Sequence, residues 1–218
     1  MSGSIKLYVT LCSTFCTVIV TGNLIFQKFV SINIFTQTFE ISVGVLLYPI
    51  TFLISDLVTE FYGKERAELM VRSGVICSII VLFLIIVADT LPVTSWSKVD
   101  NETFSLVFGV YGVGTIASII ANYFGQLVDI HVFSYFKELT NNKHLWIRNN
   151  ISTILGQFVD TIIVVLILSL FKVIGFEHLV TVIYSSFAFK VVAALLDTPF
   201  CYLGHYLIRK YKLDSPLS

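Results

Sequence analysis

Residues 149–171 read NNISTILGQFVDTIIVVLILSLF, a run in which Asp160 is the only charged side chain. A helix of roughly 20 apolar residues crosses the about 30 Å hydrocarbon core of a bilayer. This stretch therefore predicts a membrane-spanning helix, and it places a carboxyl group at membrane depth.

The composition of the whole chain agrees with a membrane protein. Of its 218 residues 56% are hydrophobic and 13% charged, whereas an ordinary soluble domain carries about 25% charged residues. The 14 basic and 14 acidic residues cancel, so no excess positive charge favours a nucleic-acid partner. The four cysteines lack paired CxxC spacing and the four histidines are dispersed, so we expect no metal and no cofactor. We expect one domain, residues 1–218, in a lipid bilayer.

Hydropathy predicts an all-α membrane protein with six transmembrane helices. The six apolar windows are approximately 7–27, 41–60, 69–88, 108–136, 149–171 and 179–208. Most Lys and Arg residues then fall on the side that holds both termini, while Lys28, Lys98 and Lys172 fall on the other. By the positive-inside rule, both termini are expected in the cytoplasm. Pro49 should kink or break the second span.

Ionisable and amide side chains inside these spans are the candidate functional residues. Such groups are costly in lipid, so they usually face the bundle interior or a water-filled cavity. In the fourth span Asn122, Gln126 and Asp129 follow at helical spacing on one face, and in the fifth Gln157 precedes Asp160 in the same way. The pattern predicts a polar central cavity.

Two further sets of charges lie in or near the spans. In the sixth, Lys190 and Asp197 are seven residues apart, nearly on one face, and could bracket a flat ligand. In the second, Asp56 and Glu60 form either a structural salt bridge with Lys64 or Arg66, or part of a transport path or its gate.

One pentad occurs twice, as GQLVD at 125–129 and GQFVD at 156–160. The two copies lie on opposite arms of a predicted helix hairpin, with the polar turn near residues 139–148 midway between them. Asp129 and Asp160 should therefore sit at similar depth. An inverted repeat often places a transporter's substrate site at the repeat interface; the alternatives are chance and plain hairpin packing. His131 is either a packing histidine or one that handles protons.

Several motifs along the chain resemble the YhhQ-type family of queuosine-precursor transporters, also grouped as vitamin uptake transporters. They are YPITFLISDLVTEFYGKERA from residue 48, GQLVDIHVFSYFK from 125, LWIRNNISTILGQFVDTIIV from 145 and FKVVAALLDTPFCYLG from 189. Asn23 and Arg148 also fit family positions. The resemblance implies six helices and uptake, across the cytoplasmic (inner) membrane, of 7-deazaguanines such as 7-cyano-7-deazaguanine, 7-aminomethyl-7-deazaguanine or queuine for tRNA modification.

The residue chemistry suits such a purine-like substrate. A carboxylate can accept two N–H bonds from a guanine-like edge, and Gln, Asn or Lys can donate to its carbonyl. Asp129 or Asp160 would do the first, and a proton shared between them could couple transport to a proton gradient. The sequence carries neither HExxH nor GxSxG, so a hydrolase is not favoured. A substrate-capturing subunit of a separately energised uptake complex stays open, as does a homodimer.

Overall fold

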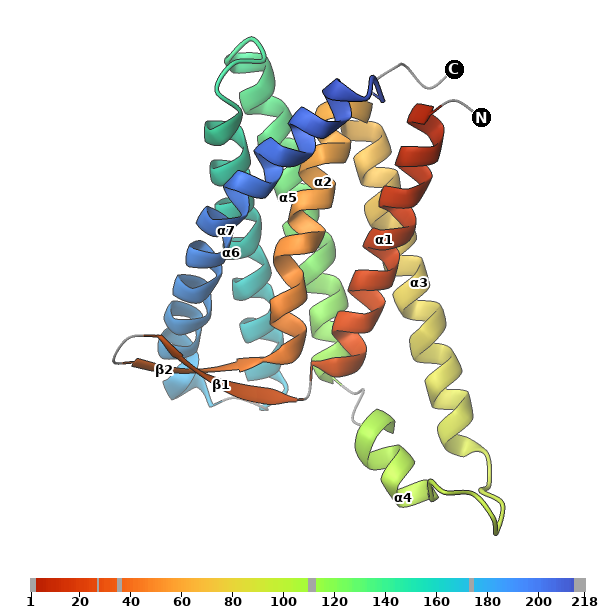
Figure 1. Ribbon diagram of the computed structural model, residues 1–218. Helices are drawn as coiled ribbons and strands as arrows, with labels where there is room; N and C mark the ends of the chain where they lie inside the picture. The colour runs from red at the N-terminus through yellow and green to blue at the C-terminus, as the bar shows by residue number, and fades with distance from the viewer. Residues whose placement is uncertain (1–2, 27, 35–36, 110–112, 173–174, 214–218) are drawn as a thin grey trace.

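Helices make up most of the protein in the computed structural model, which describes residues 3–26, 28–34, 37–109, 113–172 and 175–213. Figure 1 shows the long helices packed side by side, with the short α4 apart from them near the end of α3. In chain order the elements are α1 (Gly3–Ile25), β1 (Phe29–Ile34), β2 (Gln37–Ser42), the 3-10 turn η1 (Val43–Leu47), α2 (Tyr48–Tyr62), α3 (Lys64–Thr90), α4 (Asn101–Phe104), the π-helical turn η2 (Ser105–Gly109), α5 (Val113–Leu139), α6 (Leu145–Leu170), the 3-10 turn η3 (Phe176–His178) and α7 (Leu179–Lys210).

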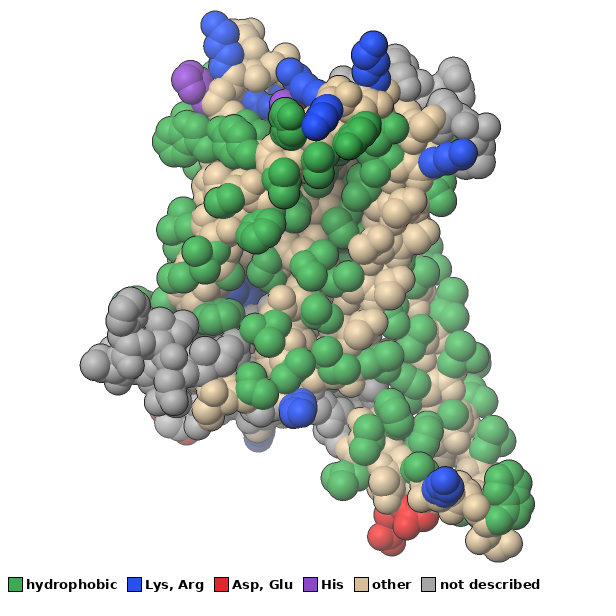
Figure 2. Space-filling model, in the orientation of Figure 1, with side chains coloured by type: hydrophobic (Ala, Val, Ile, Leu, Met, Phe, Trp, Pro, Cys, Tyr) green, Lys and Arg blue, Asp and Glu red, His purple; other side chains and the backbone are tan. Residues whose placement is uncertain are grey.

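Among the described residues, five segments are long and apolar enough to cross a membrane. They are α1, α3, α6, a segment that ends with α5, and residues 182–210 of α7. Their outer faces carry large apolar side chains. On α3, for example, Ile76, Ile80 and Phe83 are each more than half exposed. Figure 2 shows hydrophobic side chains covering most of the visible face between the two ends. Such a surface suits lipid rather than water, and the protein is an integral membrane protein.

The second predicted span differs from the expectation of a full-length helix. Residues 41–42 end a strand, η1 follows, and α2 has only 15 residues, which reach roughly 22 Å. Pro49 lies in the first turn of α2 rather than within a continuous helix. Its missing N–H costs nothing there, and its fixed φ favours starting a helix. A kinked second span is therefore not observed, because the helix begins at this proline.

The short helix α2 is nevertheless central. Figure 1 shows it between α1 and α7 with α5 behind it, and nine of its side chains are buried. Phe52 and Val58 are 1% and 0% exposed. Its end is set by Gly63, whose φ of +88° is a conformation that glycine adopts readily. The chain then reverses into α3.

An antiparallel hairpin of β1 and β2 connects α1 to α2, with Phe29 opposite Ser42 and Ile34 opposite Gln37. The hydropathy pattern did not predict it. After the hairpin, Gly44 in η1 lies against α1: a Cβ atom there would be 2.6 Å from the carbonyl oxygen of Gly22. Glycine at this position allows the two backbones to approach closely.

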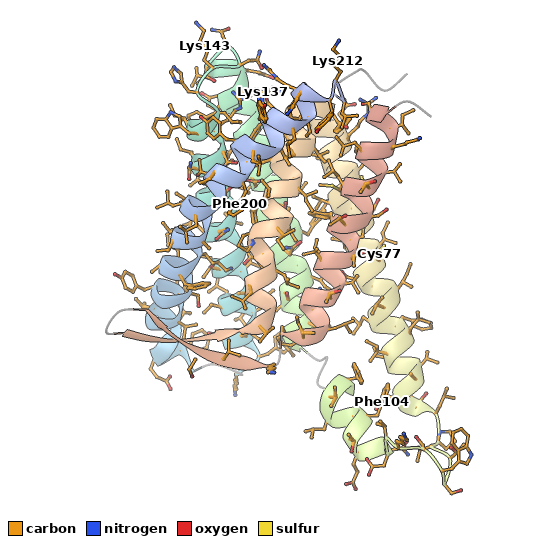
Figure 3. All side chains as sticks on the ribbon, in the orientation of Figure 1. Cys77, Phe104, Lys137, Lys143, Phe200 and Lys212 are labelled. Carbon is orange, nitrogen blue, oxygen red and sulfur yellow. The ribbon has the colours of Figure 1, made fainter. Side chains whose placement is uncertain are left out.

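The start of α1 and the end of α7 lie at the same end of the molecule (Figure 1). The sequence predicted both termini on one side, with α2 as part of the second of six spans; α2 is not one of the five segments that are long and apolar enough to cross a membrane. Lys and Arg side chains gather at that end on the face drawn in Figure 2, and Figure 3 labels Lys137, Lys143 and Lys212 there. We call it the basic end below.

Candidate functional site

The two copies of the pentad pack against each other where α5 and α6 cross. A Cβ atom on Gly156 would lie 2.7 Å from the carbonyl oxygen of Gly125. The contact is reciprocal, because a Cβ on Gly125 would lie 2.9 Å from the Cβ of Asp160, and one on Gly156 would lie 3.0 Å from that of Asp129. Small residues let membrane helices approach this closely. The crossing thus brings both aspartates to one level of the hairpin.

The polar face predicted on α5 is turned toward a polar stripe on α2. The hydroxyl groups of Tyr48 and Ser118 are 3.5 Å apart. One turn further along α2, the Thr51 hydroxyl accepts a hydrogen bond from the Gln126 amide Nε2 at 3.3 Å. A ladder of polar contacts therefore runs along the α2–α5 interface and shields these groups from lipid.

The two aspartates of the repeat enter separate networks. The ammonium group of Lys190, on α7, donates to Asp160 Oδ2 and, at 3.1 Å, to the hydroxyl of Thr161. Its nitrogen also lies 5.1 Å from the centre of the Tyr48 ring. Asp160 is 2% exposed and Lys190 7%. A buried charge requires such a partner, because an unpaired one is costly away from water.

Tyr48 connects this ion pair to α1 and α5. Its hydroxyl contacts Ser118 and Asn122, and Ser118 donates in turn to the side-chain oxygen of Asn23 at 3.0 Å. A hollow of about 20 Å³ lies beside these groups, lined by Asn23, Tyr48, Thr51 and Asn122 among others. That is room for one water molecule. We call Asn23, Tyr48, Asn122, Asp160 and Lys190 the α1–α7 network.

Asp129 faces α2 instead. Its carboxyl group contacts that of Asp56 and accepts a hydrogen bond from the Ser55 hydroxyl at 3.0 Å. The Thr153 hydroxyl of α6 lies 3.5 Å from Asp56 Oδ2, and Ser152 also contacts Asp129. Asp56 and Asp129 are 1% and 0% exposed. We call Asp56 and Asp129 the carboxyl pair; hydroxyl groups of Ser55, Ser152 and Thr153 lie around it.

Glu60 belongs to a third group of contacts, at the basic end. Its carboxylate accepts a hydrogen bond from Arg148 of α6 at 2.7 Å and lies 3.3 Å from the Lys137 nitrogen of α5. His205 of α7 is 3.7 Å away. Glu60 thus ties α2 to three other helices. A salt bridge was one of the alternatives expected of Asp56 and Glu60, but its cations come from α5 and α6 rather than from Lys64 or Arg66.

Two more expectations concern the pair of Lys190 and Asp197, and His131. Lys190 and Asp197 do not form one bracket: Lys190 pairs with Asp160, whereas Asp197, 7% exposed, acts electrostatically on Asp56 and Asp129. His131 lies on the outer face of α5, half exposed, 3.7 Å from Glu68 of α3. Residue spacing along one helix cannot show which neighbouring helix a side chain meets, and this is why the grouping differs.

The amide groups of the pentads are both fully enclosed. Gln126 is 0% and Gln157 1% exposed, and their Oε1 atoms have no hydrogen-bond partner among the described residues. A buried acceptor without a donor carries the full free-energy cost of its dehydration. Two acceptors beside the two networks are therefore ready to receive donors.

Comparison with known proteins identifies the family of the chain. The sequence profile of the family described as "Putative vitamin uptake transporter" matches residues 42–204. The chain belongs to this family. The matched region contains α2, α3, α5 and α6 and most of α7, so it includes the carboxyl pair and all of the α1–α7 network except Asn23. The protein is a membrane transporter.

Two curated relatives are similar over most of the transporter. A "Probable queuosine precursor transporter" of Bacillus subtilis (strain 168) is 25% identical over 170 residues, covering 77% of this chain and 72% of the relative. The "Queuosine precursor transporter" of Escherichia coli (strain K12) is 26% identical over 181 residues, covering 82% and 77%. No solved structure matches the chain.

Sequence reasoning missed the hydroxyl side chains in the first half of α2. Tyr48, Thr51 and Ser55 follow at steps of three and four in YPITFLIS, which is the spacing of one helix face. That periodicity is the signal in the sequence that identifies these residues. His205 carried no such signal, because only the packing of α7 brings it to Glu60.

Proposed function

We propose that this transporter takes up queuosine precursors across the inner (cytoplasmic) membrane for tRNA modification, as a small secondary carrier or facilitator. The observation that carries the proposal is family membership over residues 42–204, together with two relatives named as queuosine precursor transporters. The candidate substrates are 7-deazaguanines such as 7-cyano-7-deazaguanine, 7-aminomethyl-7-deazaguanine and queuine. Both termini face the cytoplasm, in line with the Lys and Arg side chains at that end.

The α1–α7 network supports this substrate class. Lys190 donates to Asp160 in the structure; the adjacent N–H groups of a guanine-like edge offer the same carboxylate two donors. Lys190 would then be released to donate to the base carbonyl, and Asn122 and Gln126 can complete the recognition of its edges. Substrate binding thus exchanges one hydrogen-bonded arrangement for another without leaving either charged group without a hydrogen-bond partner.

The closed packing supports a carrier that changes shape. The hollow beside Tyr48 and Asn122 holds about 20 Å³, whereas ligand pockets start at roughly 300 Å³. A base can therefore reach Asp160 only if helices separate.

At the basic end, Glu60 joins α2 to α5, α6 and α7. We assign Glu60 the role of a gate, with Arg148 as its partner.

Reconstitution in liposomes tests the function. The purified protein should exchange labelled 7-deazaguanine for unlabelled base across the bilayer, with each of the three candidates offered in turn. The variant Lys190→Met should abolish this exchange, and Lys172→Met, which lies outside the spans, should not. Binding without translocation would favour a capture subunit that depends on a separate energising complex. Neither binding nor exchange of any of these bases by the wild type would contradict the proposal.

A further inference from the structure

The carboxyl pair is an unusual arrangement for a membrane interior. Asp56 of α2 and Asp129 of α5 contact each other, and both are fully buried. Their hydrogen-bond donors among the described residues are the hydroxyl groups of Ser55 and Thr153, and Ser152 lies beside Asp129. The Oδ1 atom of each carboxyl has no partner among the described residues. Two buried negative charges at contact distance would repel strongly.

The charged groups around the pair do not relieve that repulsion. On α7, Asp197 adds a third carboxyl and Cys201 a thiol. One helical turn along α2, Glu60 is acidic as well, and the buried cation near it, Arg148 of α6, donates to Glu60 itself. Lys190 is committed to Asp160. A proton bound between the two carboxyl groups would remove one of the negative charges.

We infer that Asp56 and Asp129 together bind one proton and that this proton couples uptake to a proton gradient. The inference rests on the proposed function and adds the coupling ion and its site. The pair bridges α2 and α5, the helices whose separation would admit substrate. In the closed arrangement the proton is shared by the two carboxyl groups; when α2 moves away from α5, each carboxyl meets water and the proton leaves to it. Only O–H bonds form and break.

The aspartates of the two pentads thereby have different roles. Gly125 and Gly156 bring the helices together, Asp160 turns to Lys190 and the substrate, and Asp129 turns to Asp56 and the proton. Because both networks share α2, through Tyr48 and Ser55, movement of that helix changes both at once. This shared element is the physical basis of coupling, since each ligand favours the arrangement in which its own network is complete.

Two measurements on the same proteoliposomes separate the inference from the proposed function. One is exchange of labelled for unlabelled base at equal pH; the other is net accumulation driven by an inward proton gradient. For one proton per neutral substrate, one pH unit should give about tenfold accumulation in the wild type. Asp56→Asn should retain exchange and lose gradient-driven accumulation. Asp160→Asn, in the substrate network, should lose both.

The outcomes are distinguishable. Absence of exchange by the wild type would overturn the proposed function, whereas wild-type exchange that ignores the pH gradient would overturn only the proton inference. Accumulation driven instead by a sodium gradient, or gradient-driven accumulation that survives in Asp56→Asn, would also overturn the proton inference.

Infrared spectra of membranes give a check that does not depend on activity. The wild type should show the C=O stretch of a buried carboxylic acid that both Asp56→Asn and Asp129→Asn lack, and a spectrum without that band would contradict the inference.

Discussion

Gly156 lies so close to Gly125 across the α5–α6 hairpin that a Cβ atom on it would be 2.7 Å from the Gly125 carbonyl oxygen. Each glycine also faces the aspartate that ends the other pentad. This one contact determines how far apart α5 and α6 lie and at which level of the bundle their carboxyl groups enter.

The first prediction concerns that contact. Gly156→Ala should destabilise the protein by about 1–3 kcal/mol, because the added methyl meets a backbone atom that cannot move without shifting a helix. Thermal unfolding in detergent measures the effect. Gly22→Ala is the matched control, since its Cβ would lie 3.7 Å from the nearest atom, at ordinary contact distance. Equal melting temperatures for the two variants would show that the close approach is not needed.

The second prediction concerns the ion pair of Asp160 and Lys190. Lys190→Met should lower the stability by about 3–5 kcal/mol, because it leaves a buried carboxylate without its cation. Adding Asp160→Asn to that variant should restore much of the stability and none of the substrate exchange. Unfolding curves of the wild type, both single variants and the double variant measure the coupling. If the losses of the single variants simply add, the two residues do not act as a pair.

Tyr48 provides the third prediction, because it is the aromatic ring that lies against Lys190 and beside Asn122. Tyr48→Phe keeps the ring and should raise the concentration of base needed for half-maximal exchange only moderately. Tyr48→Leu removes the ring and should raise that concentration further. Tyr135→Leu, on the exposed surface of α5, is the control. Equal behaviour of the Phe and Leu variants would mean that the ring does not meet the substrate.

The fourth prediction concerns the basic end. Glu60→Gln should destabilise the protein by about 3–5 kcal/mol, since Arg148 is 1% exposed and would lose its carboxylate. Glu68→Gln removes a partly exposed partner of Arg72 and should cost about 0–1 kcal/mol. The comparison uses the same unfolding assay for both variants. A loss of similar size in both would indicate that burial of the Glu60 pair does not matter.

Local sequence patterns were sufficient for much of the fold. The windows 149–171 and 179–208 correspond closely to α6 and α7, because continuous apolar composition is what the bilayer requires of a span. The window 41–60 was wrong in its first part, where Pro49 begins a helix and the preceding residues form a strand and a 3-10 turn. Apolar composition alone cannot distinguish these structures from helix.

The sequence by itself determined that the chain lies in a membrane, which residues are costly there, and that Asp129 and Asp160 lie at one level of a hairpin. Periodicity and hydropathy are properties of a single helix, and they suffice for those conclusions. Only the tertiary structure decided that Asp160 meets Lys190 while Asp129 meets Asp56, and that Glu60 meets Arg148. Those partners come from helices distant in sequence, and the choice among them depends on which faces pack together in the bundle.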